Sequence, residues 1–330
     1  MTEQRALPFQ VSQAEGLSSS APSVDLEAVA ARYAVRTTPF LDQLMANAPP
    51  ENPLVRQFQP SVAELYDAPD DLADPIGDDV KSPLPGIVHR YPDRVLLKPI
   101  HVCAAYCRFC FRREQVGPGG EALNDQELER ALDYIRQTPA VWEVVLTGGD
   151  PLLLSPRRLR RIMQALEDIP HVEVLRIHSR LPVHDPHKIN REMMDALAGE
   201  GRDPERLALW MAVHINHRQE LAPEVVQALR RMQAAGIPLI SQTVLLRGVN
   251  DDPQALCDLF RGLVRHGVKP YYLHHPDPAP GTSHFRLSLD EGRAIVRAVH
   301  AQLSGLARPT YILDRPEGAG KVHISLYDEV

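Results

Sequence analysis

The sequence predicts an α/β fold in which six βα units build an open or partial barrel around a parallel sheet. Two observations predict it: apolar, β-branched runs recur along the chain, and a helix-like stretch separates each run from the next. The runs are residues 94–100, 143–147, 172–178, 207–214, 238–246 and 269–275. Ligands of such sheets bind at the carboxyl ends of the strands, so we expect the functional residues there.

The stretches between the runs carry helix start and stop signals. Asn124 is placed to cap a helix, with Glu127 as its capping-box partner. Ser155, followed by a proline, is a second helix start, and Gly236 stands where a helix should end. The expected helices are residues 125–137, 157–166, 223–236, 255–267 and 289–303.

The remaining chain divides into three parts around the barrel, which we expect to span residues 89–305. Residues 1–25 are rich in Ser, Gln and Pro and are expected to form a flexible arm. Residues 26–88 have helical spacing followed by many Pro and Asp, which indicates a helical and irregular extension. Residues 306–330 form a tail with a short strand at 310–313 and a Gly-rich end.

Composition excludes several classes of partner. The net charge is −7, so no global basic field points to nucleic acid or anionic lipid. No apolar run approaches the roughly 20 residues of a membrane helix. The N-terminus lacks the apolar core of a signal peptide, and the chain is therefore expected to be cytoplasmic.

Three of the four cysteines, Cys103, Cys107 and Cys110, follow the first predicted strand on one short loop. Three thiolates can bind three irons of a [4Fe–4S] cluster, which leaves the fourth iron free to chelate S-adenosylmethionine. The alternative is a zinc site with a fourth ligand such as His101, but no second ligand pair accompanies the loop. Cys257 lies in a helical pattern and is interpreted as a small buried residue.

From about residue 83 to residue 321 the sequence resembles the lysine 2,3-aminomutase family, the pyridoxal-phosphate-dependent branch of the radical S-adenosylmethionine (SAM) superfamily. The blocks that carry the resemblance are PGIVHRYPDRVLL, CAAYCRFCFRRE, LTGGDPLL, RIHSRLPV, QTVLLRGVND, PYYLHHPD, GTSHFR and LDRPEGAGK. It implies a partial (β/α)6 radical SAM barrel with a [4Fe–4S] cluster, SAM and pyridoxal phosphate. It further implies an isomerase in which a 5′-deoxyadenosyl radical removes hydrogen from C3 of lysine and the amino group shifts from C2 to C3. A reductant such as flavodoxin or ferredoxin is expected, and a homo-oligomer is one option.

The resemblance also assigns residues to the cofactors. The SAM ligands would be Gly148, Gly149, Asp150, Ser179, His214 and Gln242, all at predicted strand ends, where the last three could equally be satisfied core residues. The pyridoxal phosphate would be held by Arg90, Tyr91 and Arg94, a group that could otherwise be a solvated turn. Its aldehyde would bind Lys321. A nucleotide loop at Lys321 is excluded, because Arg315 and Val322 replace the Gly and Ser/Thr that it needs.

The substrate residues follow in the same way. The resemblance places Arg112 on the substrate carboxylate and Asp277 and Asp314 on the distal ammonium of lysine, since a buried cation needs paired carboxylates. Asp277 could instead cap a turn among neighbouring prolines. Arg108 is left as a supporting residue or as a charge that tunes the cluster.

Two departures from the family stand out. The chain ends nine residues after Lys321 and has Asp252 at the position of a zinc cysteine, so no structural zinc is expected. His274 replaces a tyrosine, which leaves the local cofactor contact open. Four alternatives remain: an aminomutase for another amino acid such as arginine, a branch dedicated to elongation factor P, a radical enzyme without pyridoxal phosphate, and a non-catalytic zinc-binding protein.

Overall fold

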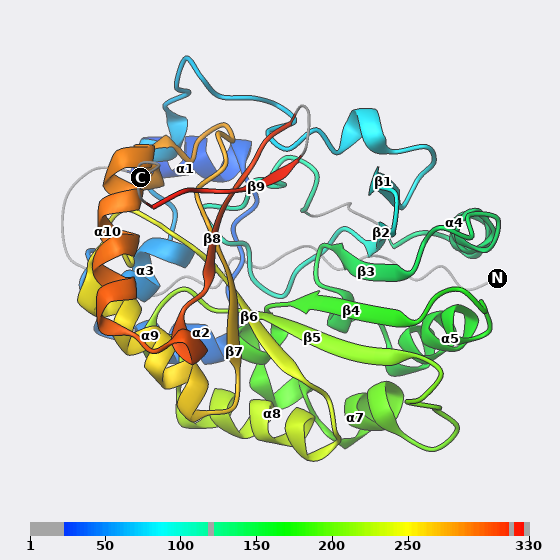
Figure 1. The fold of residues 1–330 in the computed structure, drawn as a ribbon. Helices are drawn as coiled ribbons and strands as arrows, with labels where there is room; N and C mark the ends of the chain where they lie inside the picture. Colours follow the sequence, from blue (N-terminus) through cyan, green and yellow to red (C-terminus); the bar gives the residue numbers. More distant parts are fainter. Residues whose placement is uncertain (1–22, 118–121, 317–319, 327–330) are drawn as a thin grey trace, which may run out of the picture.

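The computed structural model describes residues 23–117, 122–316 and 320–326. Within these residues, nine strands form one sheet whose spatial order follows the sequence, and the sheet curls into a half-barrel (Figure 1). The strands are β1 (Ile87–Tyr91), β2 (Arg94–Ile100), β3 (Glu143–Gly148), β4 (Val174–Ser179), β5 (Ala208–His214), β6 (Leu239–Val244), β7 (Lys269–His274), β8 (Thr310–Asp314) and β9 (Lys321–His323). Strands β2 to β8 are parallel, which confirms the predicted partial barrel.

Helices cover the outer face of the curled sheet (Figure 1). They are α4 (Asp125–Arg136), α5 (Pro156–Glu167), α7 (Arg191–Ala198), α8 (Pro223–Ala234), α9 (Pro253–Arg265) and α10 (Leu289–Gln302), with the one-turn α6 (Leu181–His184) after β4. The predicted caps are present: Asn124 and Glu127 form a reciprocal capping box, and Ser155 accepts a hydrogen bond from the Arg158 N–H. Gly236 has φ +76°, as expected for a residue that ends a helix.

Both edge strands are antiparallel and were not predicted. Strand β1 pairs with β2 across a tight turn in which Tyr91 faces Arg94, a segment for which the sequence left open a solvated turn. Strand β9 has three residues and pairs with β8, so that Asp314 lies opposite Lys321. The strand predicted at 310–313 is β8, and the tail adds β9 beside it. The predicted arm at 1–25 falls almost wholly outside the described residues.

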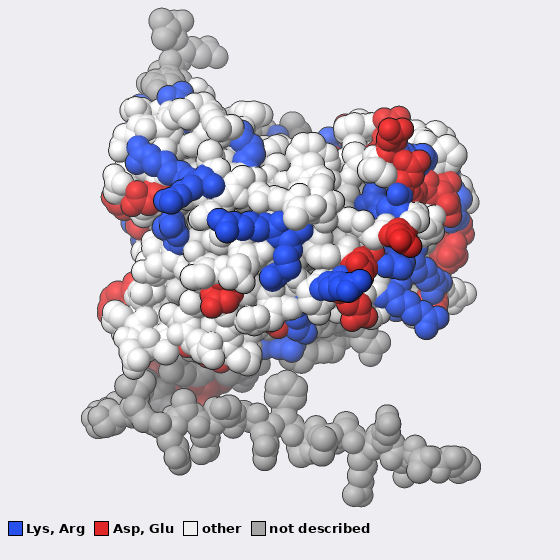
Figure 2. Space-filling view, turned by 90° about the horizontal axis from the view of Figure 1, so that it is seen from below, with Lys and Arg blue, Asp and Glu red and all other residues white. Residues whose placement is uncertain are grey.

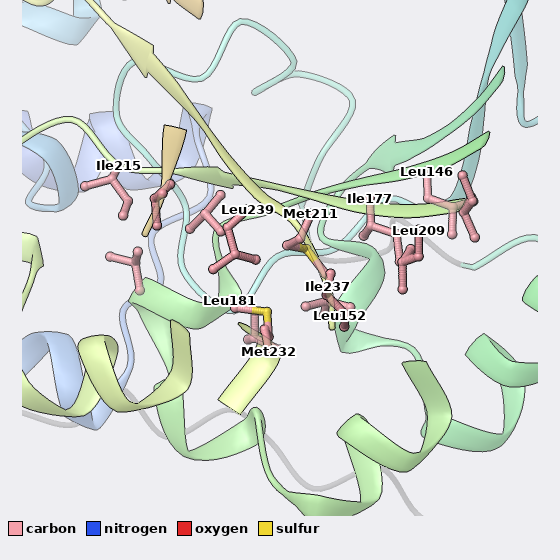
Figure 3. Close-up of a cluster of buried hydrophobic side chains, with 14 of the residues drawn as sticks. Leu146, Leu152, Ile177, Leu181, Leu209, Met211, Ile215, Met232, Ile237 and Leu239 are labelled. Atoms are coloured by element: carbon pink, nitrogen blue, oxygen red, sulfur yellow. The ribbon is translucent and has the colours of Figure 1, made fainter. Parts of the chain in front are cut away.

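Alternation along the strands separates the core from the interior of the half-barrel. In β4, Leu175 and Ile177 are fully buried. The residues that alternate with them, Arg176 and His178, point to the other face and line a cavity. Leu146, Ile177 and Met211 of neighbouring strands lie in the layer between the sheet and the outer helices (Figure 3). Each such side chain contributes about 1.5–3 kcal/mol when it is buried.

The N-terminal extension packs on the cysteine loop. Its helices are α1 (Ser23–Arg32), α2 (Pro39–Met45) and α3 (Pro53–Phe58), followed by a short 3₁₀ turn, η1 (Val62–Leu65). Leu41 and Phe58 form a small apolar cluster with Ala105, which lies between the first two cysteines. Two backbone hydrogen bonds extend this contact, from Tyr106 N to Arg36 O and from Arg108 N to Gln57 O.

A buried ion triad joins the extension to the same loop. Glu64 is fully buried and accepts hydrogen bonds from Arg108, at 3.0 Å from Nε, and from Arg113. Arg113 also donates to the Gly281 carbonyl at 2.9 Å, so the triad reaches the segment after β7. Burial alone would raise the pKa of Glu64, but the two guanidinium groups, Arg108 first, hold it below its usual range. Arg108 is thus committed to Glu64.

Surface charge on the face seen in Figure 2 is mixed: Lys and Arg side chains lie beside Asp and Glu. Exposed pairs such as Arg161 with Asp125, at 3.1 Å, are typical of solvated helix faces. Among the described residues, none of the helices is both long and apolar enough to cross a bilayer.

Replacing Glu64 by Ala should destabilise the fold by about 3–5 kcal/mol, because two guanidinium groups would stay buried without a counter-ion. Chemical denaturation of the cofactor-free protein measures this loss. Asp67→Ala is the matched control, since it breaks the exposed Arg32–Asp67 pair and should cost less than about 1 kcal/mol. Equal losses in the two variants would contradict the role assigned to the triad.

Candidate active site

One cavity of about 460 Å³ occupies the interior of the half-barrel, a size within the usual range of small-molecule sites. Every site residue predicted from the sequence lines it: Arg90, Tyr91, Arg94, Cys103, Cys107, Cys110, Arg112, Gly148, Gly149, Asp150, Ser179, His214, Gln242, Asp277, Asp314 and Lys321. These residues come from all nine strands of the described sheet or from the segments that follow them. The parallel sheet therefore gathers blocks that are far apart in the sequence, as the strand-end argument expected.

The three cysteines stand on a loop without regular structure, between β2 and α4. Burial raises the pKa of the Cys110 thiol to about 11 and that of Cys103 well above its ordinary value. Buried thiols of this kind become thiolates when a cationic metal centre binds them. Within the described part of the chain, no three His, Cys, Asp or Glu side chains converge as ligands of one metal ion. Three thiolates on one short loop fit a [4Fe–4S] cluster, in which each thiolate binds a different iron.

Gly148 and Gly149 are required by the cysteine loop itself. A Cβ on Gly149 would lie 2.4 Å from the Val102 carbonyl oxygen, and Gly148 has φ +108° with its Cβ position 2.7 Å from the Ile100 oxygen. The close approach lets Gly149 N donate to Ile100 O at 2.7 Å and Asp150 N to Val102 O at 2.9 Å. The two glycines predicted as SAM ligands are therefore also needed for packing against the cysteine loop.

The Asp150 side chain organises the end of β4. Its Oδ1 accepts from Ser179 Oγ at 2.7 Å, and its Oδ2 accepts from Arg180 N at 2.9 Å and from Leu181 N at 2.8 Å. Burial raises the pKa of Asp150 in spite of these hydrogen bonds. Asp150 and Ser179, both predicted to face SAM, are therefore hydrogen-bonded to each other beside the cysteine loop.

His214 and Gln242 lie side by side at the ends of β5 and β6, where they are register partners. His214 Nε2 lies 3.0 Å from Asn216 Oδ1, and its ring contacts the Phe109 ring edge-on at 5.6 Å. Burial lowers the pKa of His214 well below its usual value, so the ring is neutral.

The opposite part of the cavity contains Lys321. Its Nζ forms an ion pair with Asp314, and its backbone N–H donates to the Tyr91 hydroxyl at 2.8 Å. Arg90 Nη1 holds the other oxygen of Asp314 at 2.7 Å, while its Nη2 is buried with no hydrogen-bond partner. Arg94 stacks over the Tyr91 ring, with 3.8 Å from the guanidinium carbon to the ring centre. The predicted phosphate ligands thus lie next to the predicted aldehyde-binding lysine.

Asp277 and Arg112, two of the predicted substrate ligands, also line the cavity. Asp277 Oδ1 is buried without a hydrogen-bond partner, and burial, reinforced by the charge of Asp314, raises the pKa of Asp277 to about 7. The absence of a partner argues against the alternative of a simple turn cap. Arg112 forms an ion pair with Asp78, with 2.7 Å between Nη2 and Oδ2, and it lines the cavity.

Asp78, His178 and Arg180 are among the residues of the cavity wall to which sequence reasoning gave no role. Asp78 lies in the irregular extension, where no local pattern marks it. The alternation of side chains along β4 could have placed His178 on the cavity face. Arg180 could have been noticed because it belongs to the quoted block RIHSRLPV. His178 and His274 each have an unpartnered buried Nε2, and burial lowers the pKa of His274 to about 3.

The fold and the cysteine loop define a class of protein that sequence comparison also finds. A model of the radical SAM superfamily matches residues 97–260, from β2 into α9. The matched range contains all three cysteines of the loop and the Gly-Gly-Asp turn.

Similar proteins of known name indicate which family within this superfamily the chain belongs to. The L-lysine 2,3-aminomutase of Clostridium subterminale is 37% identical over 96% of this chain and 73% of that protein. The L-lysine 2,3-aminomutase of Fusobacterium nucleatum is 39% identical over 87% of this chain and 66% of that protein. The glutamate 2,3-aminomutase of Clostridioides difficile is 36% identical over 79% of this chain and 60% of that protein. The chain belongs to the lysine 2,3-aminomutase family.

Gly149→Ala should prevent the cysteine loop from adopting its conformation, because the added Cβ would collide with Val102 backbone atoms at 2.4 and 2.5 Å. We expect the variant to lose most of its iron and sulfide after anaerobic reconstitution, measured per polypeptide. Gly305→Ala is the control, since no atom lies within 4 Å of its Cβ position. Full cluster content in Gly149→Ala would show that the loop tolerates the displacement.

Proposed function

We propose that this chain is an isomerase that interconverts L-lysine and β-lysine by a radical 2,3-shift of the amino group. The observation that carries the proposal is the unpartnered carboxylate of Asp277, in one cavity with Asp314, Lys321 and the three cysteines. The relatives include enzymes named for lysine and for glutamate at nearly equal identity. Sequence similarity alone therefore does not distinguish lysine from glutamate as the substrate. The proposed substrate rests on the charged residues of the cavity wall.

The cavity wall fits the three groups that the family uses. Cys103, Cys107 and Cys110 would hold the [4Fe–4S] cluster, and the neighbouring strand ends would hold SAM. The unpartnered Nη2 of Arg90, with Tyr91 next to it, fits a phosphate oxygen. When bound, the cluster with SAM supplies a 5′-deoxyadenosyl radical, and pyridoxal phosphate supplies a carbonyl and a conjugated ring.

The carboxylate pair gives the preference for lysine. A distal ammonium that enters the cavity leaves water, which is tolerable only if carboxylates replace the lost hydration. Asp277 has an oxygen without a partner, and Asp314 is held by Arg90 and by the Lys321 amine. Asp277 Oδ1 would accept from the distal ammonium of lysine, and Asp314 would supply the second negative charge beside it.

Arg112 would receive the substrate carboxylate at the other end. Its Nε and Nη2 donate to Asp78 Oδ2, at 3.2 and 2.7 Å, and this fixes the guanidinium plane. Burial alone would raise the pKa of Asp78, but Arg112 holds it below its usual range. Asp78 therefore stays ionised, and its carboxylate orients the Arg112 guanidinium.

The wider setting is also proposed. The cluster would receive one electron from a reductant such as flavodoxin or ferredoxin, and the proposed location of the chain is the cytoplasm. Free lysine metabolism and a lysine aminomutase branch that serves elongation factor P would share this chemistry and differ in the destination of the product.

The test is an anaerobic assay of the reconstituted protein with SAM, pyridoxal phosphate, a strong reductant and either L-lysine or L-arginine. We expect β-lysine by mass spectrometry and little product from arginine. If 5′-deoxyadenosine forms without β-lysine, the radical chemistry stands and the substrate assignment falls.

Lys321→Ala is the matched control for pyridoxal phosphate. We expect the wild type to show the absorbance of a lysine-bound pyridoxal phosphate, and the variant to lose both this band and the formation of β-lysine. A wild type that forms no such band would favour a radical enzyme without pyridoxal phosphate.

The lysine dependence should change with pH through Asp277. Because the pKa of Asp277 is about 7, the carboxylate is ionised only above that pH, and kcat/KM for lysine should rise as the pH passes through about 7. Asp277→Asn should remove this rise and lower kcat/KM about 30-fold or more, since a buried charge pair is worth 2 kcal/mol or more. A variant with an unchanged pH profile would contradict the assignment.

A further inference from the structure

Arg180 stands directly after β4, and its guanidinium touches the cysteine loop. Its Nη1 lies 2.8 Å from Cys107 Sγ, within hydrogen-bonding distance of the sulfur. The side chain is 5% exposed, so this positive charge is shielded from solvent. No role was predicted for Arg180, and it is not needed to bind lysine or phosphate in the account above.

Arg180 is held by hydrogen bonds at both terminal nitrogens, whereas its buried Nε has no partner. Its Nη2 donates to Gln57 Oε1 at 2.5 Å and to Glu220 Oε2 at 2.8 Å. The guanidinium carbon lies 4.8 Å from the centre of the Phe58 ring and 5.2 Å from that of Phe109, which is favourable for a cation over aromatic faces. The guanidinium therefore stays beside the sulfur.

Glu220 is the counter-ion, and it is itself held rigidly. The side chain is fully buried, and its Oε1 accepts from Asn216 N at 2.9 Å, His217 N at 2.8 Å and Gln57 Nε2 at 3.2 Å. Only Oε2 faces Arg180. The charge next to Cys107 is thus set by one cation and one anion at fixed places.

We propose that Arg180 is a positioning residue that sets the reduction potential of the [4Fe–4S] cluster through Cys107, with Glu220 limiting its effect. The inference rests on the proposed cluster but not on the identity of the amino acid substrate. Reduction adds one electron to the cluster, so a nearby positive charge stabilises the reduced form and raises the potential, and hydrogen bonds to cluster sulfurs act in the same direction. A neighbouring carboxylate opposes this effect.

The two residues therefore predict shifts of opposite sign. In Arg180→Gln the charge at Cys107 is lost, and the potential should move to a more negative value. In Glu220→Gln one oxygen remains for the backbone N–H groups while the negative charge disappears, and the potential should move to a more positive value. A merely structural disturbance of the shared network would not reverse its sign between the two variants.

The experiment is an anaerobic redox titration with dithionite, in which the electron paramagnetic resonance signal of the reduced cluster is followed in the absence of SAM and lysine. Arg180→Lys keeps the positive charge and should lie between Arg180→Gln and the wild type. Arg231→Gln is the matched control, because Arg231 donates to the Ile189 and Pro186 carbonyls of the outer layer and is not among the described residues that line the cavity. Its potential should equal that of the wild type.

Iron and sulfide content is measured first, so that the outcomes stay separate. A wild type that holds no cluster overturns the proposed cofactor itself. If the wild type holds a cluster but Arg180→Gln shows no change, or if both variants shift in the same direction, the inference on Arg180 is wrong. If Arg180→Gln does not retain the cluster, Glu220→Gln decides: a positive shift supports the inference, and no shift or a negative shift overturns it.

Discussion

The Glu64 carboxylate lies between the guanidinium groups of Arg108 and Arg113, out of contact with water. Arg108 belongs to the cysteine loop, Glu64 to the N-terminal extension, and Arg113 reaches the segment after β7. A loop without regular hydrogen bonding cannot hold three thiols in place by itself. This ion triad, with the backbone bonds to Arg36 and Gln57, supplies the missing constraint.

The half-barrel separates charges along its cavity. Arg180 and Glu220 stand behind the cysteines, whereas Asp277, Asp314, Arg90 and Lys321 gather at the other end. At the end of the cavity that contains Lys321, two buried atoms of charged groups have no hydrogen-bond partner. They are Asp277 Oδ1 and Arg90 Nη2. Such unmade hydrogen bonds are costly, and bound ligands that complete them gain that free energy. These two unpaired groups support the proposed binding of an ammonium and a phosphate.

The parts of this structure that sequence patterns revealed are the local ones. The Asn124 capping box lies within four residues, and the six inner strands are short apolar runs. The cysteine loop was also visible, because its three ligands stand close together. Resemblance to a family added the distant residues such as Lys321.

What the sequence did not reveal depends on contacts across the chain. Arg90 meets Asp314 across 224 residues, and β9 exists only because β8 offers it a pairing edge. Asp78 carries no pattern of its own and becomes important through Arg112. Arg180 was within a quoted block, yet its contact with Cys107 spans 73 residues and follows from the way β4 ends beside the loop.

The central claim is that one cavity brings the radical source and the C3 carbon of lysine together. Isotope transfer from L-lysine carrying deuterium at C3 tests it most directly, with the nucleoside products and recovered SAM analysed by mass spectrometry. The account predicts deuterium at the 5′ carbon of SAM and of any 5′-deoxyadenosine. Formation of 5′-deoxyadenosine without deuterium, while lysine is present at saturating concentration, would contradict it.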